Sequence, residues 1–271
     1  MCRKLSSLVY VRKCVSGLVC LIGIFWAVEI RAQSTLPHEI TISAAISLKN
    51  AFEEIGRAFI ERYPGTKVLF NFGASGDLAR QIEAGAPVDI FASAAQEDME
   101  DIGKKGFVAA NSRKNFARNV LVLIKPANST IPLWALTDLK KKEVKKVAIG
   151  NPKTVPAGMY AEEALRHFNL WDVIKDKLIF AENVRQALDY VARDEADAGL
   201  VYSTDAMARP KEVKVVIKLP ETSHQPIVYP IGVIKGTKVE TWSRAFVDFV
   251  ISTEGQRILN QYGFMTTRPS M

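Results

Sequence analysis

The clearest structural pattern in this chain is Val68-Leu-Phe-Asn-Phe-Gly-Ala-Ser-Gly-Asp-Leu-Ala-Arg-Gln-Ile-Glu-Ala-Gly-Ala-Pro-Val-Asp-Ile-Phe91. Its first five residues place bulky apolar side chains on alternate positions, which predicts a β-strand, and the four small residues that follow predict a turn. A helix is predicted from about Ser75, because Leu78 and Ile82 fall on one helical face. The apolar run that ends the stretch is predicted as a second strand. Strand, turn, helix and strand together form the unit from which parallel sheets are built.

The start of the predicted helix at Ser75 is suited to bind an anion. The first N–H groups of a helix have no partner within it, and they point outward with the positive end of the helix dipole. Serine is also a favoured helix N-cap, so the usual explanation of Ser75 alone is a cap without a ligand. Residues 40–45 predict an earlier strand, and Ser47 lies between it and an amphipathic helix that Tyr63-Pro-Gly65 ends. The two serines therefore occupy equivalent strand-to-helix junctions.

Strands and helices alternate along the rest of the chain. Apolar runs predict strands, amphipathic segments between them predict helices, and Asn183 is a candidate N-cap. This alternation predicts an α/β fold with mostly parallel sheets. The predicted strands after residue 92 are 119–125, 147–149, 178–180, 198–202, 213–219 and 227–234.

The order of these elements predicts two lobes. Residues 118–226 contain a complete series of strands and helices of their own, so they are predicted to form lobe II. Residues 33–117 and 227–271 are predicted to form lobe I, with the chain crossing between the lobes twice. Such an arrangement places a cleft between the lobes, and ligands of open α/β sheets bind at the carboxyl ends of the strands.

The first 32 residues differ from the rest of the chain. Four basic residues precede an uncharged, mostly apolar run at 14–28, and Ala32 lies near a plausible cleavage point. This pattern predicts a secretory signal peptide at residues 1–32, with a retained N-terminal anchor as the alternative. The segment also contains all three cysteines of the chain, Cys2, Cys14 and Cys20. The remaining chain therefore has neither a disulfide nor a thiol-based metal site.

The charge of the chain does not favour a nucleic-acid partner. The formal net charge is +7, but residues 1–32 carry five Lys or Arg and one Glu, so +3 remains on the rest. The basic run at 140–146 is interrupted by Glu143, and no aromatic residues lie between its lysines. It is predicted to be a solvated face, and no nucleic-acid partner is expected.

Five segments follow one another in an order that points to a known family. They are Ala44-Ala-Ile-Ser-Leu-Lys-Asn-Ala51, residues 73–87, Val155-Pro-Ala-Gly-Met-Tyr-Ala161, Glu182-Asn-Val-Arg-Gln-Ala-Leu188 and Gly199-Leu-Val-Tyr-Ser-Thr-Asp-Ala206. Together they closely resemble the periplasmic molybdate-binding proteins of ABC-type importers, over residues 40–264. A single motif of this kind is weak, whereas five in the same order are specific.

The resemblance implies a two-lobed periplasmic binding protein fold of type II, with two mostly parallel, doubly wound sheets and a ligand cleft between the lobes. It implies a non-enzymatic protein that captures molybdate, and tungstate with it, in the periplasm and delivers the ion to an ABC permease. No cofactor is expected, because molybdenum enters only as the centre of the bound oxyanion. A monomer is expected, since the sequence shows no sign of oligomerisation. The residues that match the ligand site of the family are Ser47, Ser75, Ala157, Val184 and Tyr202.

In that family neutral donors alone hold the tetrahedral oxyanion. The matching donors are the hydroxyl and N–H of Ser47 and Ser75, the N–H groups of Ala157 and Val184, and the phenol of Tyr202. Such donors can stabilise a dianion, because charge-assisted hydrogen bonds are individually strong, and they leave no unpaired cation in the empty site. Only the resemblance selects Ala157 and Val184. Tyr202 alone would be explained as a core aromatic residue with a satisfied hydroxyl.

Two other functions compete with this assignment. A hydrolase is disfavoured, because Ser75 does not lie in a Gly-x-Ser-x-Gly elbow. The three histidines, His38, His167 and His224, lie in no recognisable motif either. The closer alternative is a binding protein for another small anion, such as sulfate or phosphate. Protonated phosphate would require an acceptor, for which Asp77 is the candidate, although the charge of Asp77 opposes an anion nearby.

Overall fold

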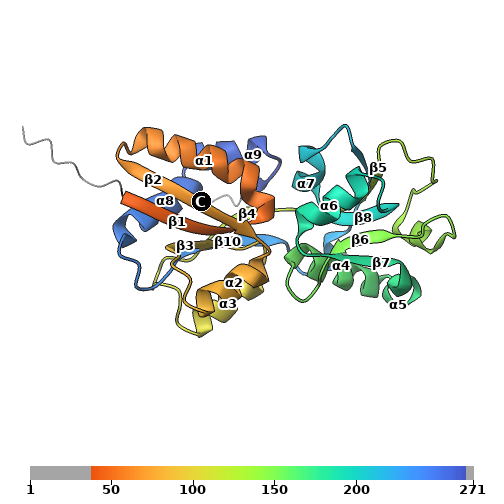
Figure 1. Cartoon of the computed structure of the whole chain (residues 1–271), viewed down its shortest axis with the longest axis horizontal. Coiled ribbons are helices and arrows are strands. Elements are labelled where there is room, and N and C mark those ends of the chain that lie inside the picture. Colours follow the sequence, from red (N-terminus) through yellow and green to blue (C-terminus); the bar gives the residue numbers. More distant parts are fainter. Residues whose placement is uncertain (1–37, 267–271) are drawn as a thin grey trace, which may run out of the picture. The chain divides into compact units, whose positions relative to one another are not determined.

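Two β-sheets organise residues 38–266, the part of the chain that the computed structural model describes (Figure 1). The predicted signal peptide at residues 1–32 and its cleavage point lie outside the described residues. Among the described helices, none combines the length and the apolar character of a membrane span.

The first sheet has six strands in the order β11-β4-β10-β3-β1-β2. Figure 1 shows α1 and α9 on one side of this sheet and α2 and α3 on the other. Ile40 and Ile42 of β1 are fully buried in the main core, whereas Leu78 of α2 and Met99 of α3 belong to a smaller apolar cluster. The strands are β1 (His38–Ala45), β2 (Thr66–Gly73), β3 (Ile90–Ala92), β4 (Lys114–Arg118), β10 (Val228–Val233) and β11 (Met265–Thr266). The helices are α1 (Lys49–Arg62), α2 (Ser75–Glu83), α3 (Gln96–Lys104), α8 (Glu240–Ile251) and α9 (Thr253–Gln261).

The second sheet has five strands in the order β7-β6-β8-β5-β9. Figure 1 shows α6 and α7 on one side of it and α4 and α5 on the other. All residues of β6 and β8 are buried, as expected of central strands that carry helices on both faces. The strands are β5 (Leu121–Pro126), β6 (Val147–Gly150), β7 (Leu178–Ala181), β8 (Ala198–Tyr202) and β9 (Val213–Lys218). The helices are α4 (Pro156–His167), α5 (Trp171–Ile174), α6 (Val184–Ala192) and α7 (Ser203–Ala208).

The predicted two-lobed α/β fold is confirmed, but the expectation of mostly parallel sheets is wrong. β1 pairs in parallel with β2 and β3, and β6 pairs in parallel with β7 and β8. The other five pairings are antiparallel. Four of these five pairings involve β5 or β10, and the fifth joins the edge strand β11 to β4. β5 is the first strand after the chain crosses into the second sheet, and β10 is the first strand after it returns. The two crossovers thus introduce reversed strands that a regular series of strand–helix–strand units would lack.

The two crossovers lie beside each other. The chain leaves the first sheet after Arg118 and returns to it at Val228. Between these points the Asn119 N–H donates to the Ile227 carbonyl oxygen at 3.2 Å. The division into lobes at 117/118 and 226/227 stays a prediction.

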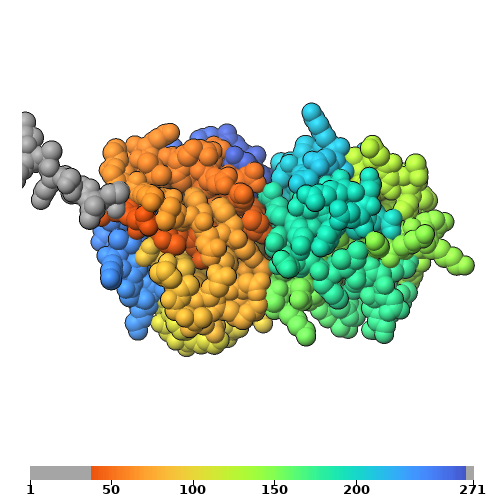
Figure 2. All heavy atoms as spheres, in the orientation of Figure 1, coloured from red at the N-terminus to blue at the C-terminus, as the bar shows by residue number. Residues whose placement is uncertain are grey.

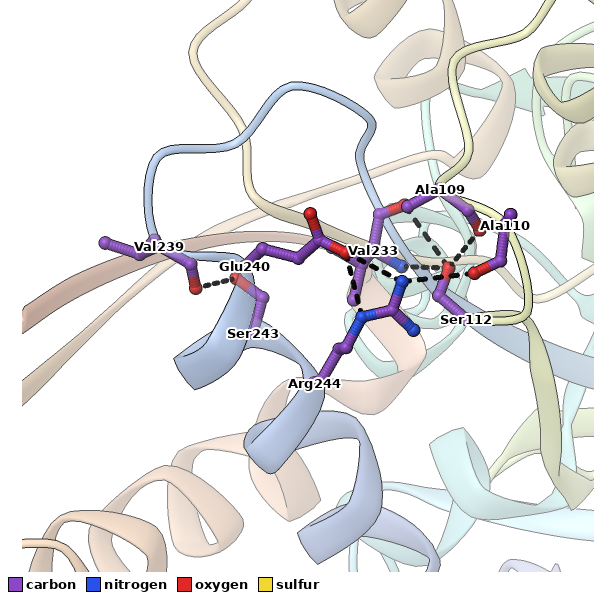
Figure 3. Close-up of polar contacts among 8 residues, drawn as sticks. All are labelled: Ala109, Ala110, Ser112, Val233, Val239, Glu240, Ser243 and Arg244. Atoms are coloured by element: carbon purple, nitrogen blue, oxygen red, sulfur yellow. Dashed lines mark hydrogen bonds and ion pairs between the residues drawn. The ribbon is translucent and has the colours of Figure 1, made fainter.

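Polar contacts join the loop at residues 109–112 to β10 and α8 (Figure 3). Ser112 Oγ accepts a hydrogen bond from the Val233 N–H at 3.0 Å and donates to the Ala109 carbonyl at 2.8 Å. Arg244 of α8 donates to the Ala110 carbonyl at 3.1 Å and pairs with Glu240 at 2.7 Å. The loop before β4 is therefore held by both β10 and α8.

Candidate functional site

The five candidate residues all lie where a strand gives way to a helix. Ser47 is in the short 3-10 helix Ile46–Leu48 after β1, and Ser75 is the first residue of α2 after β2. The other three belong to the second sheet. Ala157 is the second residue of α4 after β6, Val184 is the first residue of α6 after β7, and Tyr202 ends β8. β1 and β2 are parallel, as are β6, β7 and β8, so the carboxyl ends of each group share one edge of their sheet.

These five residues meet at one small cavity. Its volume is about 10 Å³, which is close to what one water molecule requires. Both sheets contribute to it, and the side chains that line it are uncharged. The lining residues are Ala45, Ile46, Ser47, Gly73, Ala74, Ser75, Ala94, Val155, Pro156, Ala157, Val184 and Tyr202.

Elements of the two sheets contact each other beside this cavity. The N–H of Gly76 in α2 donates to the carbonyl oxygen of Thr154, in the segment before α4, at 3.1 Å. Figure 2 shows orange atoms of the first sheet region meeting green and cyan atoms of the second along a continuous boundary. Residues of both sheets therefore line the cavity and also contact each other beside it.

The interpretation of the two serines as plain helix caps is wrong. The N-cap of α2 is Ala74 and that of the 3-10 helix is Ala45, so neither serine stands at a cap position. Ser75 Oγ instead accepts a hydrogen bond from the Ala94 N–H at 3.0 Å, and Ser47 Oγ lies 3.1 Å from the Tyr229 hydroxyl oxygen. Both hydroxyls are buried and lie beside the cavity.

Tyr202 differs from an ordinary core tyrosine. Its hydroxyl is buried, and no hydrogen-bond partner is found for it among the described residues. Burial raises the pKa of this phenol well above its usual value, so the hydroxyl keeps its proton. An unsatisfied buried hydroxyl costs about 1–3 kcal/mol. A water molecule or a ligand bound in the cavity would supply the missing hydrogen-bond partner.

Two backbone N–H groups at helix starts could act as further hydrogen-bond donors. Ala157 and Val184 lie in the first turns of α4 and α6, where an N–H has no partner inside its own helix. Asn183 caps α6 by accepting from the Gln186 N–H at 3.0 Å, as predicted, and this leaves the Val184 N–H available. The N-terminal ends of α2, α4 and α6 thus meet at one cavity, where their dipoles favour negative charge.

Charged residues near the cavity are paired with each other. Asp77 forms an ion pair with Arg80 on the exposed side of α2, and it does not line the cavity. Arg185 of α6 donates through Nε to the Asp205 carboxylate at 2.6 Å. Burial raises the pKa of Asp205. The Arg185 guanidinium lowers this pKa, but the effect of burial is larger. Arg185 is not among the residues predicted from the sequence, although it lies directly after Val184.

Two further polar residues behind the cavity were also missed. Tyr229 is fully buried and contacts Ser47, and Asn119 contacts Tyr229. Tyr229 lies within an apolar strand pattern, so nothing in the sequence separates it from a core residue. Asn119 was noted only as the start of a strand. Among the described residues, no cluster of His, Cys, Asp and Glu is suited to hold a metal ion.

Comparisons with known proteins give relatives that cover most of the chain. The family model of bacterial extracellular solute-binding proteins matches residues 40–265. The molybdate-binding protein ModA of Haemophilus influenzae is 39% identical over 232 residues, which are 83% of this chain and 89% of the relative. ModA of Escherichia coli is 40% identical over 231 residues, 83% of this chain and 88% of the relative.

The fold is shared with a solved structure as well. The periplasmic molybdate-binding protein of Azotobacter vinelandii superimposes with a TM-score of 0.77 at 23% identity, covering 84% of this chain and 100% of that one. The resemblance found in the sequence motifs is confirmed by these relatives.

Proposed function

Because the chain belongs to the family of bacterial extracellular solute-binding proteins, we propose that it captures molybdate and tungstate and delivers them to an ABC permease. The observation that carries this proposal is the convergence of five neutral donor residues on one cavity. They are Ser47, Ser75, Ala157, Val184 and Tyr202. The names of the two ModA relatives support the choice of ion.

The donor set suits a fully deprotonated tetrahedral dianion. Three helix N-termini and three hydroxyl groups surround the cavity, and each can donate a hydrogen bond toward its centre. No positively charged side chain lines it, so removal of the ion would leave no unpaired cation. Binding therefore rests on oriented dipoles and hydrogen bonds.

The same donor set would discriminate among oxyanions. Molybdate and tungstate have nearly the same size and charge, so both are expected to bind. Sulfate is smaller and cannot reach every donor of a rigid site at once. Phosphate at neutral pH carries a proton that requires an acceptor, and a buried polar group without a partner is costly.

Capture of the ion is proposed to use movement at the crossovers. A cavity of about 10 Å³ does not admit a tetrahedral oxyanion from solvent, so the lobes have to part. The two crossover segments, joined by the bond from Asn119 to Ile227, are the natural hinge. The permease is proposed to recognise the closed, loaded form.

Further assignments follow from the family and from the sequence. We propose that residues 1–32 export the chain to the periplasm, where it acts as a monomer without catalytic activity and without a nucleic-acid partner. The ligand is transported unchanged, and no cofactor takes part.

Another small anion is the alternative ligand. A phosphate site would require an acceptor, and Asp77 is the acidic residue that the sequence offered for this role. Its pairing with Arg80 outside the cavity argues against that role.

Calorimetric titration of the chain from residue 33 tests the proposal. Molybdate and tungstate should bind, sulfate and phosphate should bind weakly or not at all, and Ser75→Ala should reduce molybdate affinity. Ser129→Ala, outside the cavity lining, is the control and should bind as the parent protein does. Tight binding of phosphate instead of molybdate would overturn the proposed ligand.

A further inference from the structure

A second cavity, here called the outer cavity, adjoins the ligand cavity at Ser47. Its volume is about 140 Å³, and residues of both sheet regions line it. Asn50, Met207 and Gln261 in its lining are exposed, whereas Ser47 is buried and also lines the ligand cavity. The outer cavity therefore extends from the protein surface to the wall of the ligand site.

A single positive charge marks the outer cavity. Arg185 is the only charged side chain among the described residues that line it. Its Nε donates to the Asp205 carboxylate at 2.6 Å, but Asp205 is fully buried and does not line the cavity. Tyr262 in the lining bonds to Glu54 at 2.7 Å, and Glu54 likewise lies outside the lining. The ion pair thus presents its positive member to the cavity and keeps its negative member beneath.

A third cavity, here called the acidic cavity, has the opposite character. Its volume is about 670 Å³, and it adjoins the ligand cavity at Val155 and Pro156. Five acidic and three basic side chains line it, so its formal charge is negative. They are Glu83, Glu97, Asp98, Asp101 and Glu163, and Arg80, Lys105 and Lys153. An anion therefore meets unfavourable charge at the acidic cavity and favourable charge at the outer cavity.

Such a contrast acts on the approach of an anion. A cleft lined by charge of one sign raises the local concentration of oppositely charged ions and their association rate. An anion in the outer cavity lies on the side of Arg185, with Asp205 behind, so Asp205 weakens this attraction without cancelling it. Steering of this kind changes association much more than dissociation, and salt screens it.

We propose that Arg185 steers oxyanions through the outer cavity toward the ligand site, where uncharged donors then hold the ion. This inference rests on the proposed function, because it concerns how the same site is reached. Arg185 lines the outer cavity and not the ligand cavity, so its charge sets the speed of capture and does not hold the bound ion.

The test measures association and dissociation rates of molybdate by stopped-flow fluorescence, with calorimetric titration as a check on their ratio. Arg185→Gln should slow association about two- to fivefold at about 10 mM salt, as expected of one charge acting on a dianion through water over about 8 Å. Its dissociation rate should stay close to that of the parent protein. The difference in association rate should shrink at about 150 mM salt.

Asp205→Asn separates steering from a structural role of the ion pair. It leaves the charge of Arg185 uncompensated, so it should speed association by a similar factor. A role in holding the structure together would instead predict that both substitutions impair binding. Arg185→Lys keeps the positive charge and should keep most of the association rate.

Arg80→Gln is the matched control. Arg80 is also an arginine paired with an aspartate, Asp77, but it lines the acidic cavity. Its replacement should slow association less than Arg185→Gln does. If Arg185→Gln does not fold because Asp205 is left unpaired, its combination with Asp205→Asn replaces it. This double variant removes both charges and should also slow association.

The outcomes separate this inference from the proposed function. If the parent protein binds neither molybdate nor tungstate, the proposed function fails. If it binds molybdate and Arg185→Gln changes only the dissociation rate, Arg185 supports the structure of the site and the inference is overturned. Slower association in both Arg185→Gln and Asp205→Asn overturns it as well. So does an Arg80→Gln variant that slows association as much as Arg185→Gln.

Discussion

Replacing Gly76 with alanine is expected to weaken anion binding while leaving the ligand-free fold intact. The Gly76 N–H donates to the Thr154 carbonyl oxygen at 3.1 Å, between elements of the two sheets. A Cβ at Gly76 would lie 2.9 Å from that oxygen and 3.2 Å from the Thr154 Cα. Both atoms belong to the backbone and cannot rotate away, so the methyl group fits only if the two elements separate.

The size of the effect follows from the contacts that are lost. Loss of the hydrogen bond removes about 0.5–1.5 kcal/mol from the closed form. Overpacking of a close contact typically costs about 1–3 kcal/mol more. A total of about 1.5–4.5 kcal/mol against closure corresponds to roughly 10- to 1,600-fold weaker binding.

The assay combines calorimetric titration with molybdate and thermal unfolding without ligand. Gly103→Ala is the matched control, because Gly103 is also a helical glycine of the first sheet region and an added Cβ meets nothing within 4 Å. The control should keep its affinity for molybdate, while Gly76→Ala should lose affinity but keep its unfolding temperature. Unchanged affinity in Gly76→Ala would show that the contact with Thr154 does not control binding. A loss of ligand-free stability that accounts for the whole loss of affinity would show the same.

Three further substitutions have distinct expected outcomes. Tyr202→Phe should stabilise the ligand-free protein by about 1 kcal/mol, because it removes an unsatisfied buried hydroxyl, and it should weaken molybdate binding at least tenfold. Thermal unfolding measures the first effect and calorimetric titration the second. A destabilised ligand-free variant would contradict the expectation. Burial is the main cause that raises the Asp98 pKa from 3.8 to about 6, so its ionisation costs stability increasingly as the pH rises through this interval. Asp98→Asn should therefore gain up to about 3 kcal/mol at pH 7 and nothing at pH 3.5, and equal gains at both would disprove the assignment. Asp77→Asn should keep or raise molybdate affinity in a titration, because Asp77 lies outside the cavity lining; a clear loss would place Asp77 in the site.

Much of the fold could be predicted from local sequence patterns. The apolar runs at 40–45, 198–202 and 227–234 correspond to β1, β8 and β10, because buried strands need continuous apolar residues. β4 was not predicted, since its sequence Lys-Asn-Phe-Ala-Arg is mostly polar and owes its pairing to β10 and β11. The bounds of α4 are not fixed by such patterns alone; it begins at Pro156, a residue well suited to the first turn of a helix.

The candidate site could be predicted only in part. Ser47 and Ser75 could be selected from the sequence because they lie at strand-to-helix junctions. Their hydrogen bonds to Tyr229 and Ala94 could not be predicted, since those partners are distant in sequence. Ala157 and Val184 are proposed to bind the anion through backbone N–H groups, so their side chains carry no signal. Tyr229 belongs to a strand that returns from the second crossover, and its contact with Ser47 spans 182 positions along the chain. Local patterns do not encode contacts of this kind.

Uncharged donors alone are proposed to hold the anion, and anomalous diffraction from crystals grown with molybdate can locate the ion among them. One molybdenum peak is expected in the cavity, with oxygen atoms about 2.7–3.1 Å from Ser47 Oγ, Ser75 Oγ and the Tyr202 hydroxyl. The N–H groups of Ala157 and Val184 should lie at similar distances from the ion. A peak beside Arg185 or a lysine, with no ion in the cavity, would show that charged side chains bind the anion instead.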